Sequence, residues 1–222
     1  MSVASFLALV CIVFGVQLPA QLWSMALEWV CNQFDRSLLQ ILEGNAMDMD
    51  NLGLWLYVCL AAPIVEEILF RGLVLRSLLP YGKRFAIVSS AVLFGMFHAS
   101  PVQTPYAFLV GLVLGYVAVE HHVLWAIVLH MMNNWLLSDS LPRLLEHLPY
   151  QLGDTALWVF LGVCTLVGLL LLLRNHGRIA MWYRKDPIDR WKHKAFYTSP
   201  CILILIAWCM IDLLTYFLLM FL

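Results

Sequence analysis

The sequence reads Pro63-Ile64-Val65-Glu66-Glu67-Ile68-Leu69-Phe70-Arg71 inside an apolar segment, so two carboxylates and a guanidinium lie among hydrocarbon side chains. A charged side chain in the centre of a bilayer is costly unless it is paired or hydrated. Glu67 and Arg71 are four residues apart with the acid first, the favourable order for an ion pair on one helix face. Glu66 points about 100° away from Glu67 on a helical wheel. It therefore needs a polar cavity or a partner from another helix.

Pro63 lies one turn before Glu66 in the same segment. A proline inside a helix removes one backbone hydrogen bond and bends the helix, which leaves a carbonyl oxygen free. Within a membrane, a freed carbonyl must find another hydrogen-bond donor. The stretch thus predicts a helix that is opened locally beside its charged residues.

The composition of the whole chain is that of a polytopic helical membrane protein. Of the 222 residues, 63% are hydrophobic and 12% are charged, about half the charged share of a soluble chain. This excludes a disordered chain and a cytosolic enzyme, and a net charge of −1 gives no reason to expect a nucleic-acid partner. We predict an all-α transmembrane helix bundle that forms one integral membrane domain over residues 1–222.

Long apolar runs define the predicted membrane spans, since a helix needs about 20 apolar residues to cross the hydrocarbon core. Pro19 predicts a bend or break in the first run. The third and fifth runs have only 15 residues each, so we expect them to be buried within the bundle. We predict about seven spans by this criterion: Val3–Val30, Leu52–Leu79, Arg84–His98, Tyr106–Val119, Val123–Leu137, Thr155–Leu173 and Cys201–Leu222.

The distribution of basic residues predicts the orientation, because Lys and Arg are enriched in cytoplasmic loops. With a cytoplasmic amino terminus, ten of them fall in inner loops and two, Arg36 and Arg143, in outer loops. The carboxyl terminus is then outside, and residues 174–199 form a basic cytoplasmic loop that contacts anionic lipid. The inner ten are Arg76, Lys83, Arg84, Arg174, Arg178, Arg184, Lys185, Arg190, Lys192 and Lys194. The predicted outer loops carry the acids Asp35, Glu43, Asp48, Asp50, Asp139, Glu146 and Asp154.

Two further spans contribute polar side chains at a comparable depth. His98 ends the third span, and His130 and Asn134 lie four residues apart on one face of the fifth. At ~1.5 Å per residue from the cytoplasmic ends, Glu66, His98, Asn134 and His130 lie roughly 20, 21, 17 and 11 Å deep. A single histidine in a bundle is usually a packing residue. An acid, two imidazoles and an amide in one layer indicate a catalytic site.

Other polar groups support weaker interpretations. Glu120-His121-His122 falls between the fourth and fifth spans and is typical of an interfacial turn. Gly111 and Gly115 form a small-residue pair typical of close helix packing. Asp212 lies within the last span and also needs a partner, but we do not assign it to the site.

The residues Glu66-Glu67-xxx-Arg71, Phe94-xxx-His98 and His130-xxx-Asn134, in this order, resemble the motifs of the CPBP family of intramembrane proteases. That family includes the CAAX prenyl endopeptidases of the Ras-converting type and bacterial proteins linked to bacteriocin processing and self-immunity. The resemblance covers residues 52–137 and implies that these core spans enclose a membrane-embedded peptidase site.

The resemblance also implies a role for each motif residue. Glu66 would activate water with help from His98, while His130 and Asn134 would polarise the scissile carbonyl and stabilise its oxyanion. Glu67 and Arg71 would support the motif helix. In a competing scheme, zinc is the cofactor and Glu66, His98 and His130 are its ligands. Because Arg71 is expected to engage Glu67 and no HExxH helix is present, we favour the scheme without a metal.

Two other classes of function compete with the protease. A catalytically silent scaffold or self-immunity protein would usually lack part of the motif set, which is complete here. Paired internal repeats with interrupted helices would favour a proton-coupled transporter, and the sequence has no such repeats. For the protease, the buried site implies membrane lipid as a partner and a peptide or protein substrate delivered through the bilayer. The compact chain favours a bacterial plasma-membrane enzyme that processes peptides or membrane-anchored proteins.

Overall fold

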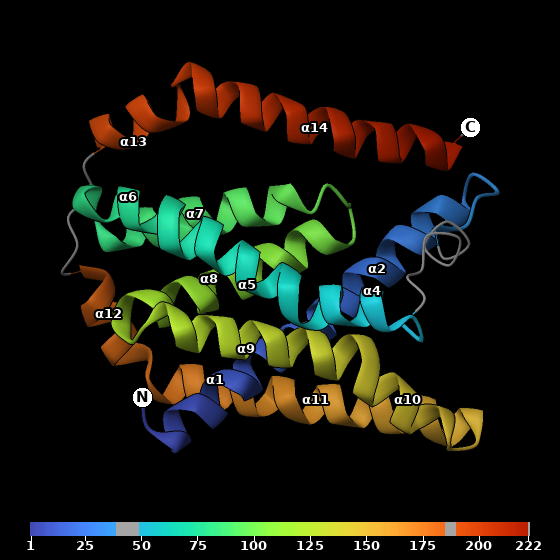
Figure 1. Ribbon diagram of the computed structural model, residues 1–222. Coiled ribbons are helices and arrows are strands. Elements are labelled where there is room, and N and C mark those ends of the chain that lie inside the picture. Colours follow the sequence, from blue (N-terminus) through green and yellow to red (C-terminus); the bar gives the residue numbers. More distant parts are fainter. Residues whose placement is uncertain (39–48, 185–189, 222) are drawn as a thin grey trace.

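The computed structural model describes residues 1–38, 49–184 and 190–221, and all the regular structure in these ranges is helical. The helices run back and forth between two ends of an elongated bundle, and the two termini lie at opposite ends (Figure 1). In chain order they are α1 Val3–Gly15, α2 Gln17–Asn32, α4 Leu52–Leu56, η1 Tyr57–Ala61, α5 Ala62–Glu67, η2 Ile68–Leu75, α6 Arg76–Leu78, η3 Leu79–Tyr81, α7 Lys83–Phe97, α8 Gln103–Glu120, α9 Val123–Trp135, η4 Leu136–Ser140, α10 Leu141–Glu146, α11 Tyr150–Arg174, α12 His176–Arg184, α13 Arg190–Tyr197 and α14 Pro200–Phe221.

Within the described ranges, three helical segments are long and apolar enough to cross a membrane: Val3–Asn32, Gln103–Glu120 and Tyr150–Arg174. A shorter apolar stretch covers Pro200–Thr215 within α14. The chain is therefore an integral membrane protein with an all-helical fold, as the composition predicts. The count of seven spans remains a prediction.

The first apolar run is divided near Pro19, as predicted, but the break comes earlier than the proline itself. Helix α1 ends at Gly15 and α2 begins at Gln17. A proline ring clashes with the carbonyl four residues before it, and for Pro19 that carbonyl belongs to Gly15. The physical effect of the proline is thus felt one turn toward the amino terminus.

The stretch around Glu66 belongs to one long helical segment that alternates between α-helical and wider π-helical turns. The π-helical turns are η1, just before Pro63, and η2, just after Glu67. At the end of η1 the Ala62 N–H donates to the carbonyl of Tyr57, five residues back. In this register the next carbonyl, that of Val58, faces Pro63, which has no N–H to donate. The sequence predicted a freed carbonyl, and the π-helical register assigns it to Val58.

Helix α7 is packed tightly along α8, as expected for the short third span. A Cβ atom added at Gly95 would lie 2.9 Å from the Thr104 carbonyl oxygen, and one at Gly111 would lie 3.2 Å from the Ala91 Cα. The predicted glycine pair on α8 thus allows close approach, since Gly115 also faces α7. This packing fixes the position of the carboxyl end of α7, where His98 lies.

We expect Gly95→Ala to destabilise the protein by about 1–3 kcal/mol, the usual cost of overpacking, because the new methyl group meets backbone rather than a movable side chain. The matched control is Gly162→Ala, since, apart from neighbouring residues of its own helix, no atom of the described structure lies within 4 Å of a Cβ at Gly162. Thermal unfolding of both variants in detergent measures the difference. Equal melting temperatures would contradict the close α7–α8 contact.

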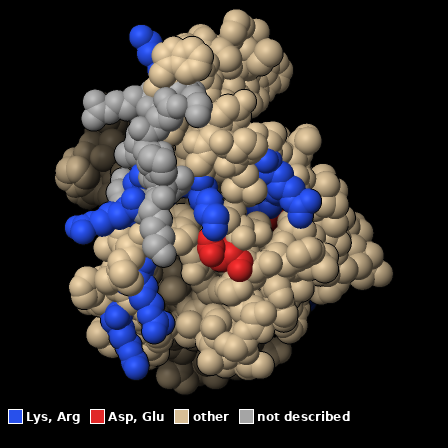
Figure 2. All heavy atoms as spheres, turned by 90° about the vertical axis from the view of Figure 1, so that its left-hand side faces the viewer, with Lys and Arg blue, Asp and Glu red and all other residues tan. Residues whose placement is uncertain are grey.

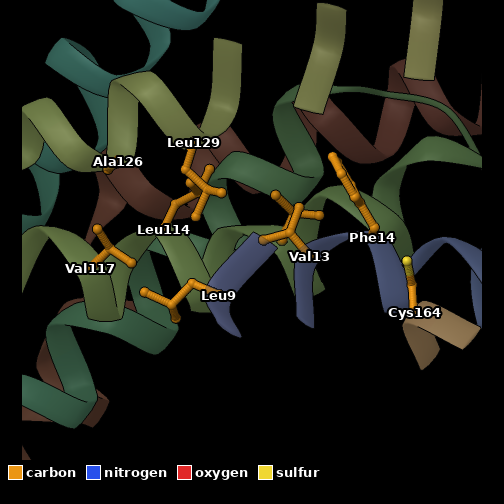
Figure 3. Close-up of a cluster of buried hydrophobic side chains, with 9 residues drawn as sticks. Leu9, Val13, Phe14, Leu114, Val117, Ala126, Leu129 and Cys164 are labelled. Atoms are coloured by element: carbon orange, nitrogen blue, oxygen red, sulfur yellow. The ribbon is translucent and has the colours of Figure 1, made fainter. Parts of the chain in front are cut away.

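An apolar core lies where α1, α8, α9 and α11 meet. Figure 3 shows its side chains converging from these helices, with Leu114 of α8 and Leu129 of α9 completely buried. Because Leu129 directly precedes His130, this core holds the part of α9 that carries the predicted site residues. The other members drawn with labels are Leu9, Val13, Phe14, Val117, Ala126 and Cys164.

The end of the bundle that lies at the left of Figure 1 is basic. Figure 2 shows Lys and Arg side chains gathered on this end, around a small acidic spot. Here Glu120 accepts hydrogen bonds from Lys83 (2.8 Å) and from the Trp182 indole (3.0 Å), while His122 caps the start of α9. The predicted interfacial turn is thus a structural junction. Of the residues used to predict orientation, Glu43, Asp48 and Lys185 lie outside the described residues.

Candidate active site

The predicted ion pair within the motif helix is present and completely buried. Arg71 Nη1 donates to Glu67 Oε1 at 2.7 Å, and both side chains have no exposed surface. The second guanidinium nitrogen donates to the Gly111 carbonyl at 3.2 Å. The guanidinium carbon lies 4.2 Å from the centre of the Phe94 ring, a cation–π contact. Arg71 therefore joins its own helix to α7 and α8.

His130 lies between the two glutamates. Its Nδ1 is 3.0 Å from Glu67 Oε1, and its Nε2 is 3.8 Å from Glu66 Oε2. A carboxylate can only accept, so the Nδ1 proton of His130 is directed to Glu67 and the Nε2 is directed toward Glu66. The sequence predicted that Arg71 would engage Glu67, but it gave no sign that Glu67 also orients His130.

His98 reaches the same cluster from the carboxyl end of α7. Its Nδ1 donates to the Phe94 carbonyl at 2.8 Å, which leaves the Nε2 lone pair available. The Phe94 ring contacts both imidazoles, and its centroid lies 4.9 Å from that of His98 and 5.6 Å from that of His130. In the described part of the chain, no hydrogen bond or ion pair joins His98 to Glu66. The expected cooperation of His98 with Glu66 therefore stays a prediction.

Asn134 faces the opened part of the motif helix. Its Nδ2 donates to the Val58 carbonyl at 3.1 Å, the carbonyl that Pro63 leaves free. His130 and Asn134 thus both point toward the segment that carries Glu66, as their four-residue spacing predicts. The structure therefore brings the four predicted site residues to one region. Glu66 comes from α5, His98 from the end of α7, and His130 and Asn134 from α9.

The hydrogen bonds around Asn134 include two residues, Tyr106 and Asn133, that the sequence analysis did not predict. Tyr106 of α8 donates to the Asn133 side-chain oxygen at 2.8 Å, and the Asn133 amide donates to Asn134 Oδ1 at 3.3 Å. Asn133 is buried. The sequence held one usable signal for Asn133, a second amide in a membrane span, but none for Tyr106, since a tyrosine near a span end is typical of an interfacial anchor.

The two adjacent glutamates differ in exposure and in partners. Glu66 keeps 21% of its side chain exposed and, among the described residues, has His130 as its one ion-pair partner. Glu67 has no exposed surface and two partners on one oxygen. An accessible carboxylate can take a proton from a bound water. The buried, engaged carboxylate of Glu67 is suited to orienting its neighbours.

The side chains present fit a metal only in part. His98 and His130 each direct Nδ1 to an oxygen acceptor, an arrangement found in metal-binding histidines. In the described ranges, however, no group of three His, Cys, Asp or Glu side chains is placed to hold one metal ion. The zinc set Glu66, His98 and His130 is therefore not assembled in this arrangement, and we derive no chemical step through a metal.

Comparison with protein families matches residues 48–136 to the type II CAAX prenyl endopeptidase Rce1-like family. Over these residues the chain is similar to a CPBP-family protease. The match begins before the motif helix and ends just after Asn134, so the matched segment contains every residue of the site. Searches of curated proteins and of solved structures found no match to the chain.

Proposed function

We propose that this protein is an intramembrane endopeptidase of the CPBP type that uses a glutamate-activated water. The observation that carries the proposal is the difference between the two glutamates, because Glu66 is partly accessible and 3.8 Å from His130 while Glu67 is buried and engaged. Glu66 is thus the carboxylate available to a water molecule. The family match over residues 48–136 supports CAAX-type endopeptidase activity.

In the proposed reaction, Glu66 removes a proton from water and the oxygen forms a bond to the scissile carbonyl carbon. His98 assists this activation of water through the available lone pair of its Nε2. The oxyanion accepts a hydrogen bond from the Asn134 amide, and His130, whose Nδ1 donates to Glu67, polarises the same carbonyl. When the carbon–nitrogen bond breaks, Glu66 returns its proton to the leaving amine. Each role uses a side chain of this chain alone.

Removal of metal is expected to leave this reaction unchanged. After treatment of the purified protein with a strong zinc chelator and its removal, we expect the initial rate of cleavage to stay within about twofold of the untreated rate, since general acid–base chemistry supplies the mechanism. Metal analysis of both samples accompanies the rates. A loss of activity that is restored by one equivalent of Zn²⁺ would instead support the ligand set Glu66, His98 and His130.

The test of the proposal is cleavage by the purified chain in proteoliposomes. Two fluorogenic probes are used: a farnesylated CAAX peptide and a membrane-spanning peptide without a prenyl group. Cleavage of either probe by correctly inserted protein supports an endopeptidase. Cleavage of neither would favour the catalytically silent scaffold or self-immunity protein.

We propose a bacterial plasma-membrane location, with peptides or membrane-anchored proteins that reach the buried site through the bilayer as native substrates. The membrane-spanning probe is then the better substrate. Cleavage of the prenylated probe alone would contradict this substrate class without contradicting the protease.

We also propose that the amino terminus is cytoplasmic and the carboxyl terminus outside. The basic end of the bundle supports this orientation, because Lys and Arg are enriched on the cytoplasmic side. The test is to fuse a reporter enzyme that is active only in the cytoplasm to each terminus. We expect reporter activity from the amino-terminal fusion and none from the carboxyl-terminal fusion. The reverse pattern would overturn it.

A further inference from the structure

A chain of hydrogen bonds begins outside the family motifs and passes through the motif residue Asn134. It runs from the Tyr106 hydroxyl of α8 to Asn133, from Asn133 to Asn134, and from Asn134 to the Val58 carbonyl of η1. The three distances are 2.8, 3.3 and 3.1 Å. These hydrogen bonds therefore connect three helical segments, α8, α9 and η1, through Asn134, the residue proposed to donate to the oxyanion.

The Val58 carbonyl fixes the direction of every bond in this chain, because a backbone carbonyl can only accept. It requires that Asn134 presents its NH₂ group to Val58, so that Asn134 Oδ1 faces Asn133. Asn133 must then present its NH₂ group to Asn134 and its oxygen to Tyr106. The Tyr106 hydroxyl completes the chain as the donor.

The same geometry prevents the rotated form of Asn134. With its amide turned over, its oxygen would face the Val58 carbonyl oxygen, and its NH₂ would face the NH₂ of Asn133. Both contacts would be repulsive, and unpaired polar groups are expensive inside a membrane protein. The Asn134 NH₂ has two hydrogens and Val58 accepts one, so the other is held in a fixed direction and is free for a substrate carbonyl.

We infer that Tyr106 and Asn133 are positioning residues of the proteolytic site, which hold the Asn134 amide with one N–H directed to the substrate oxyanion. This inference rests on the proposed function and deepens it. It also explains the π-helical turn before Pro63, since that register supplies the free carbonyl that determines which way the Asn134 amide faces.

The test is Tyr106→Phe, which removes the hydroxyl and keeps the ring. We expect kcat for a cleaved probe to fall about tenfold, the lower range for the loss of a group that orients an active-site residue, with KM nearly unchanged. The matched control is Tyr197→Phe, because the Tyr197 and Ser89 hydroxyls form a similar 2.8 Å hydrogen bond away from the site. The control should lower thermal stability by a similar amount and keep the wild-type kcat.

A double-variant cycle separates positioning from general destabilisation. If Tyr106 acts through Asn134, then Tyr106→Phe has no further effect on kcat once Asn134 has been replaced by Ala. Equal fold-losses of kcat in the wild-type and Asn134→Ala backgrounds would overturn the inference. So would a Tyr106→Phe protein with the kcat of the wild type.

A measurement without substrate keeps this inference distinct from the proposed function. Protein labelled at asparagine is observed by NMR in detergent micelles, with the side-chain amide signals of Asn133 and Asn134 assigned by their Ala variants. We expect Tyr106→Phe to shift or broaden both signals and Tyr197→Phe to leave them in place. Unchanged signals would overturn the inference even if the protease is active, whereas an inactive wild type with the expected shifts would contradict only the proposed function.

Discussion

Replacing Glu66 by Gln is expected to lower probe turnover by about 10²- to 10⁴-fold, the contribution of a positioned general base. The substitution keeps the shape of the side chain and removes its ability to take a proton from water. Because Glu66 is partly exposed and its ion-pair partner in the described structure is His130 at 3.8 Å, we expect the melting temperature to change little. Turnover by proteoliposomes and thermal unfolding measure the two effects.

A control for this substitution is available at the basic end of the bundle. Glu120→Gln makes the same chemical change in a glutamate that binds Lys83 and Trp182 and has no contact with the site residues in the described structure, and it should keep wild-type turnover. In host cells, a comparison of protein termini between wild type and Glu66→Gln would also name native substrates. Near-normal turnover by the Glu66→Gln protein would remove the basis of the whole site assignment.

Features that depend on helical periodicity could be predicted from the sequence. The Glu67–Arg71 ion pair follows from a four-residue spacing within one helix, and the structure has it at 2.7 Å. The common direction of His130 and Asn134 follows from the same rule. These predictions need no knowledge of which helix packs on which, so they hold whatever the tertiary arrangement is.

Features that depend on contacts between helices could not be predicted in this way. The partner of Glu66 is set by how α9 packs beside the motif helix, and no spacing in the sequence encodes that distance. The role of Tyr106 depends on a carbonyl that becomes free only because the helix before Pro63 adopts a π-helical register. An α-helical register would have left the carbonyl of Cys59 free instead, and the amide of Asn134 would have needed a different acceptor.

Replacing Arg71 by Ala is expected to lower the free energy of unfolding by about 3–5 kcal/mol, the usual cost of removing one partner of a buried ion pair. It leaves the Glu67 carboxylate buried without its guanidinium and removes the contacts of Arg71 with Gly111 and Phe94. We expect Glu67→Gln to destabilise the protein for the converse reason, because it leaves the guanidinium charge unbalanced. Thermal and denaturant unfolding in detergent measure both losses. A variant Arg71→Ala that unfolds like the wild type would contradict the buried pair.

The double variant Glu67→Gln with Arg71→Met separates the structural role of the pair from its role in the site. Removing both charges leaves no unbalanced ion, so we expect it to regain part of the stability that Arg71→Ala loses. Activity should not return, because a neutral side-chain amide in place of the Glu67 carboxylate, which lies 3.0 Å from His130 Nδ1, holds the proton on that nitrogen less strongly. Recovered stability with recovered turnover would mean that Glu67 serves the fold alone. Recovered stability without turnover would mean that the same carboxylate anchors Arg71 and orients His130 for the reaction.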